Sequence, residues 1–165
     1  MKGVWTFTLR DKEGNVIQKE EKNNEITYMG VGYMLDNTIN RSNIANFAAG
    51  STWIGVGTGS ETFTSWDATL GTEVSGAGNL GRQLTTTNSR TGYKALISTT
   101  FGVGIGSGAL DEAGIFVKGY GSGNTLLSPT NALDTGMIFN KVVMGVINKD
   151  ENNTLQVDVE VKMND

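Results

Sequence analysis

Carboxylates are the side chains in this sequence that could best support catalysis. The chain contains neither His nor Cys, so Ser–His and Cys–His nucleophile pairs and thiolate zinc sites cannot be built. Asp111 and Glu112 are adjacent, but neighbours on a strand point to opposite faces. A glycan-cleaving site needs two carboxylates roughly 5–10 Å apart on either side of a sugar. Other acidic residues would have to complete such a site, and the candidates in the long segment 58–81 are Glu61, Asp67 and Glu73.

Two further loop types have compositions typical of ligand sites. The oxygen-rich turns 11–15 and 150–153 could supply calcium ligands, but neither has EF-hand spacing, and hairpin turns favour the same residues. The glycine-rich runs 55–59 and 102–108 share glycines with nucleotide-binding loops, but no helix pattern follows them and no G-x-x-x-x-G-K-[ST] motif occurs. We therefore predict no catalytic residue, no metal site and no cofactor.

The overall composition excludes several kinds of partner. The formal net charge of −4 argues against nucleic-acid binding, which requires a basic face. No stretch approaches the roughly 20 apolar residues of a membrane helix, so we expect no membrane partner. The chain has 165 residues with 23 Gly and a single Pro, which indicates one domain of short strands joined by tight turns.

The elements that must position these residues begin with an N-terminal hairpin. Val4–Arg10 alternates between apolar and polar residues, the turn formers 11–15 follow, and Val16–Lys19 is the expected return strand. Exposed strand edges can pair with another chain, so the hairpin 3–20 is a candidate for sharing with a neighbouring subunit.

One helix is expected near residues 24–40. Apolar residues recur at nearly helical spacing in Asn23–Asn40, and Asn24 can cap the first turn. Gly30 and Gly32 weaken helical propensity, but their small size would let another element pack closely.

Further strands are predicted from short apolar runs between turn residues. They are 51–57, 82–88, 93–101, 110–118, 141–148 and 154–163. The pair 82–88 and 93–101 would form a hairpin across Ser89–Gly92, and a turn is expected at Tyr120–Asn124. The strict alternation of 154–163 indicates one face on a core and one in water. Together these patterns predict an all-β fold, an antiparallel β-sandwich or jelly roll, in a single domain 1–165.

Four residues are the expected contact points with partner proteins. Phe63 and Trp66 are large aromatic residues in a polar loop, whereas Trp53 is assigned to the core. Arg90 is expected at a turn tip, and Tyr120 is a fourth aromatic candidate. Aromatic residues and arginine are enriched at protein interfaces.

Short glycine-based motifs follow one another along the chain. They are Asn24–Thr27 with Gly30, the WIGVGTG run Trp53–Gly59, Leu70 with Glu73 and Arg82, the EAGIF run Glu112–Phe116, and the alternating strand Leu155–Met163. In this order they resemble a family of small bacteriophage virion proteins, often labelled tail-fibre, collar or structural proteins. The longer segment Gly121–Gly136 departs from the family pattern.

The resemblance implies a β-sandwich that is made in a bacterial cytoplasm and works on the virion. It implies a non-enzymatic, homo-oligomeric protein of the tail, collar or fibre region that docks to tail, portal, collar or capsid subunits. A capsid decoration protein is the alternative reading. A glycan on the host surface is a further expected partner, and a carbohydrate-binding or glycan-cleaving module is the less favoured alternative.

Overall fold

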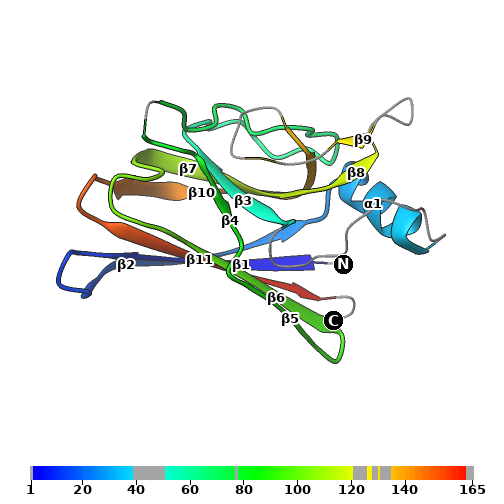
Figure 1. Cartoon of the computed structure of the whole chain (residues 1–165), viewed down its shortest axis with the longest axis horizontal. Coiled ribbons are helices and arrows are strands. Elements are labelled where there is room, and N and C mark those ends of the chain that lie inside the picture. Colours follow the sequence, from blue (N-terminus) through cyan, green and yellow to red (C-terminus); the bar gives the residue numbers. More distant parts are fainter. Residues whose placement is uncertain are drawn as a thin grey trace.

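The computed structural model describes residues 2–38, 51–76, 78–120, 126–127, 130 and 135–162. Two antiparallel sheets pack face to face, with the helix α1 at one end (Figure 1). Sheet A contains, in spatial order, β2 (Val16–Glu25), β1 (Lys2–Arg10), β11 (Thr154–Lys162), β6 (Lys94–Phe101) and β5 (Thr87–Thr91). Sheet B contains β10 (Met137–Lys149), β7 (Gly108–Val117), β3 (Trp53–Gly57) and β4 (Arg82–Leu84). The short strands β8 (Gly119–Tyr120) and β9 (Leu126–Leu127) pair with each other. The predicted all-β sandwich is confirmed.

The hydrophobic core lies between the sheets and is built from alternating strands. Trp5, Phe7 and Leu9 of β1 are buried, as are the odd-numbered residues 155–161 of β11, while the intervening residues are polar and face outward. β1 pairs with β11 of the same chain along its whole length, so the N-terminal hairpin forms the edge strand β2 and the strand next to it, β1, of sheet A. The predicted alternation of both strands is confirmed.

Strand β7 differs because both of its faces are buried. Ala113, Ile115 and Val117 face the core, whereas Phe116 packs in a second apolar cluster with Leu70. This second cluster lies on the outer side of sheet B, where segment 58–81 covers the strands (Figure 1). A strand buried on both faces loses the alternating pattern that a half-exposed strand shows.

Helix α1 (Tyr28–Thr38) begins later than the sequence predicts. The expected cap Asn24 lies in β2 opposite Gly3, and its side chain contacts Trp5, Asn140 and the Lys141 carbonyl. Thr27 caps the helix instead, because its buried hydroxyl accepts a hydrogen bond from the Gly30 amide at 2.9 Å.

The expected close packing at the helix glycines is confirmed at one of them. A Cβ at Gly30 would collide with the Phe139 carbonyl, whereas Gly32 has open space. Gly30 therefore lets α1 approach β10 closely.

Two further sequence predictions are wrong in detail. The turn of the second hairpin lies at Gly92–Tyr93, because Gly92 adopts a positive φ of 58°. Arg90 therefore lies within β5, opposite Ala95, and not at a turn tip. Tyr120, the first residue of the turn expected at Tyr120–Asn124, belongs to β8 and pairs with Leu126; the rest of that turn lies outside the described residues.

Candidate functional site

Segment 58–81 is a fixed cover on sheet B. Its early and late parts pair with each other and with β3: the Thr58 amide donates to the Thr72 carbonyl at 2.8 Å, and the Val74 amide donates to the Val56 carbonyl at 3.0 Å. Leu70 of this segment is buried in one cluster with Ile138, and the partly buried Trp53 packs against this cluster. Residues carried by this segment therefore have defined positions.

A buried carboxylate, Glu112 of β7, ties the cover to the sheet. Its side chain is fully buried and accepts hydrogen bonds from three backbone amides, those of Gly59 at 3.2 Å, Gly71 at 2.8 Å and Thr72 at 2.7 Å. Any side chain at Gly57 or Gly59 would occupy the space of the Glu112 carboxylate. The glycines of the WIGVGTG run are therefore needed for close approach.

Lys141 of β10 joins Glu112 to the middle of the cover. Its ammonium group is almost wholly buried and lies 3.3 Å from Glu112 Oε2 and 3.1 Å from Asp67 Oδ2. A buried charge loses its hydration and has to be balanced by an opposite charge and hydrogen bonds. Displacing Asp67 would remove one of the two carboxylates that balance the buried positive charge of Lys141. This contact therefore fixes the position of the cover.

A second buried ion pair lies under the far end of the cover. The Arg82 guanidinium donates to both carboxylate oxygens of Glu73, at 2.5 and 2.8 Å, and to the Thr135 carbonyl. It also lies 3.6 Å from the centroid of the Phe116 ring. This pair fixes the end of the segment in the same way.

The tight turn 64–67 presents Trp66 from the cover. The Asp67 amide donates to the Thr64 carbonyl at 3.1 Å, and the Thr64 hydroxyl and amide donate to the Asp67 carboxylate at 2.6 and 3.2 Å. Burial acts to raise the pKa of Asp67, but the Thr64 hydrogen bonds and Lys141 outweigh it and lower the pKa below its ordinary value. Asp67 is therefore charged near neutral pH and closes the turn.

Trp66 itself is exposed and packs at a tilt against another exposed aromatic ring. Its side chain is 79% exposed, and its ring centroid lies 4.4 Å from that of Tyr28, which is 52% exposed. The Tyr28 amide also donates to the Ser65 carbonyl at 2.8 Å. Val31 and Leu35, three and seven residues after Tyr28 on α1, are exposed as well. We call Tyr28, Val31, Leu35 and Trp66 the apolar patch.

The four predicted contact residues lie in different parts of the fold. Phe63 and Trp66 belong to the cover, Phe63 being half-buried. Arg90 is exposed on β5 at the edge of sheet A, and Tyr120 lies in β8. The sequence reasoning missed Tyr28 and Leu35, although their spacing of seven residues marks a second apolar stripe on the helix.

The acidic residues considered for catalysis are largely used to hold the structure together. Glu112 and Asp67 do come together, but through Lys141, and the burial of Glu112 leaves a substrate no access to it. Partial burial and the neighbouring Glu112 raise the pKa of Asp111. In the turn 11–15, the Asp11 carboxylate accepts hydrogen bonds from the Asn15 amide and side chain. Among the described residues, no three metal-binding side chains cluster. The contacts of Glu112, Asp67 and Glu73 anchor segment 58–81 to sheet B.

No family model, curated protein or solved structure matches this chain. The structure thus defines the class, a mainly β sandwich of two antiparallel sheets with one short helix. Across the described residues, no helix has the length and apolar content to cross a membrane.

Proposed function

We propose that this protein is a non-enzymatic structural component of a bacteriophage particle, in its tail, collar or fibre region. It acts by symmetric assembly with copies of itself and by docking to other virion subunits. Two observations support this proposal: the order of the sequence motifs, and the exposed apolar patch on a rigid base. The patch carries the argument, because it supplies a surface suited to contact.

The patch has the properties of a preorganised interface. Exposed aromatic and aliphatic side chains in one place mark interaction sites on protein surfaces, and tryptophan and tyrosine are frequent anchors there. The Thr64–Asp67 turn and the Asp67–Lys141 contact fix the backbone on both sides of Trp66. A partner that binds Trp66 therefore has little conformational entropy to remove.

The charge distribution supports self-association through the patch. None of its four side chains is charged, whereas the chain as a whole has a net charge of −4. Two copies that meet through these four side chains bring no like charges together at the centre of the contact, which favours a symmetric contact there.

Light scattering on the purified protein over a range of concentrations tests this proposal. We expect a discrete homo-oligomer, such as a trimer or hexamer, and a monomer at all concentrations would contradict it. Counting copies per particle then separates the two virion positions. About a dozen copies indicates the tail or collar, and hundreds indicate a capsid decoration protein.

A further inference from the structure

Each sheet ends in two edge strands, and the unpaired backbone groups of an edge strand can pair with another chain. Both edges of sheet B are protected against such pairing. Strand β4 is only three residues long. The register of β10 with β7 shifts between Ile138 and Asn140 and again between Val143 and Ile147. Short strands and bulges are two of the ways in which proteins keep edge strands from pairing.

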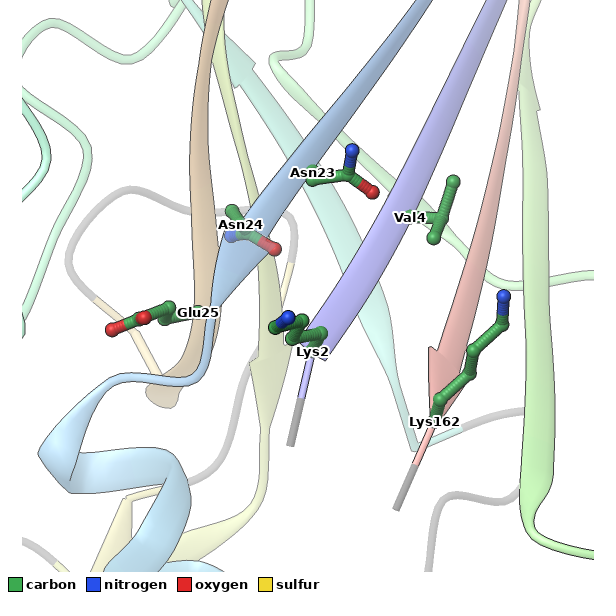
Figure 2. A pocket seen from close by; sticks show the side chains of 6 residues that line it. All are labelled: Lys2, Val4, Asn23, Asn24, Glu25 and Lys162. Atoms are coloured by element: carbon green, nitrogen blue, oxygen red, sulfur yellow. The ribbon is translucent and has the colours of Figure 1, made fainter. Parts of the chain in front are cut away.

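Strand β2, one edge of sheet A, is protected in two other ways. Five of its ten residues are charged, and charged side chains oppose pairing with a further strand. Its side chains also contact β10: Glu20 accepts a hydrogen bond from the Gly145 amide at 2.6 Å. Near the end of β2, beside the pocket drawn in Figure 2, the Asn24 side chain donates to the Lys141 carbonyl. The side of the sandwich where β2 and β10 meet is therefore closed.

Strand β5, the opposite edge of sheet A, has none of these protections. Four of its five residues are exposed, its only charged residue is Arg90, and it contains no Pro. Its register with β6 is regular from Thr87 to Thr91. In the described part of the chain, β6 is the only strand that pairs with it, and the tip of the β5–β6 hairpin projects from the sandwich (Figure 1). β5 is therefore the edge that is open to a further strand.

The hairpin turn determines which backbone groups of β5 are free. A two-residue turn joins Thr91 to Lys94, and the two residues that flank such a turn form a hydrogen-bonded pair. Hydrogen-bonded and non-hydrogen-bonded pairs alternate along an antiparallel ladder. The amide and carbonyl of Ser89 therefore face β6, whereas those of Asn88 and Arg90 point toward the open edge.

We propose that β5 pairs antiparallel with β5 of a second copy of this chain, about a two-fold axis at Ser89. The two A sheets then form one continuous sheet. In this register, Asn88 lies opposite Arg90 of the second copy and exchanges backbone hydrogen bonds with it, and Thr87 lies opposite Thr91 of the second copy. The inference rests on the assembly with copies of itself proposed above, and it names a second surface for that assembly, which shares no residue with the apolar patch.

The residues of β5 are complementary to themselves in this register. Thr–Thr pairs are favourable cross-strand pairs, whereas an axis at Arg90 would place two arginines directly opposite each other, which is destabilising. Among the described residues, the polar atoms of the Asn88 side chain have no hydrogen-bond partner. Arg90 of the second copy would donate to the Asn88 side-chain oxygen once that side chain turns toward it. The edge therefore fits a second copy of itself.

Single cysteines test the register, because the chain contains no Cys. The two copies of Ser89 would form a non-hydrogen-bonded pair with Cα atoms roughly 4.5 Å apart, which a disulfide can span. In the Thr87→Cys control the two thiols would lie four residues apart along the strands, roughly 13 Å, which is too far.

After mild oxidation, we expect the Ser89→Cys variant to run as a covalent dimer in non-reducing electrophoresis and the Thr87→Cys variant to run as a monomer. A mixture of the Thr87→Cys and Thr91→Cys variants should give a covalent dimer as well, because these positions lie opposite each other. Equal cross-linking of the Ser89→Cys and Thr87→Cys variants would overturn the proposed pairing.

A proline variant tests the backbone hydrogen bonds. Arg90→Pro removes an amide that points toward the open edge and leaves the ladder with β6 intact, while Arg90→Ala removes the same side chain and keeps the amide. We expect Arg90→Pro to raise the dissociation constant of the oligomer about tenfold over that of Arg90→Ala, as measured by sedimentation velocity.

Equal dissociation constants of these two variants would also overturn the pairing. If the wild type is still oligomeric in light scattering, that result removes the β5 contact and leaves the proposed assembly standing. A wild type that is monomeric at all concentrations would overturn both.

Discussion

The outer faces of the two sheets use charged residues in opposite ways. On sheet A, Glu160 contacts both Lys94 and Lys162, and about a third or more of each of these side chains is exposed. On sheet B, Glu112 and Lys141 are almost fully buried beneath segment 58–81 and bind its backbone and Asp67. One face keeps its charges in water, and the other uses them to hold a cover in place.

The difference shows how the same residue types serve different purposes. Exposed ion pairs contribute little stability because water and salt screen them, so those on sheet A add little to the free energy of unfolding. Buried charges cannot be left unbalanced, so those on sheet B fix the cover and the Trp66 turn that it carries. Trp66 has a defined position because the charges that hold its turn are buried.

Lys141→Met should produce the largest change in stability. It leaves Glu112 buried without its counter-ion, and removal of one partner of a buried pair lowers the free energy of unfolding by about 3–5 kcal/mol. Urea denaturation measures this loss. The matched change on sheet A, Lys94→Met, should alter stability by less than about 1 kcal/mol because Lys94 is 55% exposed. Equal losses in the two variants would contradict the comparison.

Gly57→Ala should have the next largest effect. The new methyl group would overlap the Glu112 carboxylate and the Thr72 carbonyl, at a cost of about 1–3 kcal/mol in the free energy of unfolding. Gly32→Ala is the control, because Gly32 lies in α1 with open space around it. Alanine should stabilise that helix by about 1 kcal/mol. The midpoints of thermal unfolding should therefore move in opposite directions.

Lowering the pH should destabilise the turn 64–67, with a smaller effect than either substitution above. The pKa of Asp67 is lowered in the folded state, so its stabilising contribution is present above the ordinary value of 3.8 and is lost as the pH falls below it. Tryptophan fluorescence of a Trp5→Phe, Trp53→Phe variant would follow Trp66 alone during an acid titration. In an added Asp67→Asn variant, the transition below pH 4 should disappear. If the transition persists in the Asp67→Asn variant, a group other than Asp67 causes it.

The alternating strands were predictable from the sequence, because a strand with one solvent-exposed face shows alternating apolar and polar residues in its own sequence. Val157 and Val159 are buried as their positions in β11 indicate. The sequence patterns of β7 and β10 were less clear, because residues far away in the chain cover the outer faces of these strands. The ends of elements depended on single residues, as Thr27 and Gly92 show.

The candidate site was predictable only in part. The sequence pointed to Trp66 as an exposed aromatic residue of a polar loop, and the structure shows that it is exposed; its role in contacts stays a prediction. The contact of Lys141 with Asp67 and Glu112 joins three separate segments. No local pattern encodes such a contact, so the rigid support of Trp66 could not be read from the sequence.

Sedimentation velocity of Trp66→Ala beside Tyr93→Ala tests the central claim most directly. Tyr93 is 76% exposed in the β5–β6 turn, so both variants remove an exposed aromatic ring, and each should change stability by less than about 1 kcal/mol. We predict that Trp66→Ala shifts the wild-type oligomer toward monomer while Tyr93→Ala sediments like the wild type. Unchanged assembly of Trp66→Ala, with its fold intact by circular dichroism, would contradict a contact function for the apolar patch.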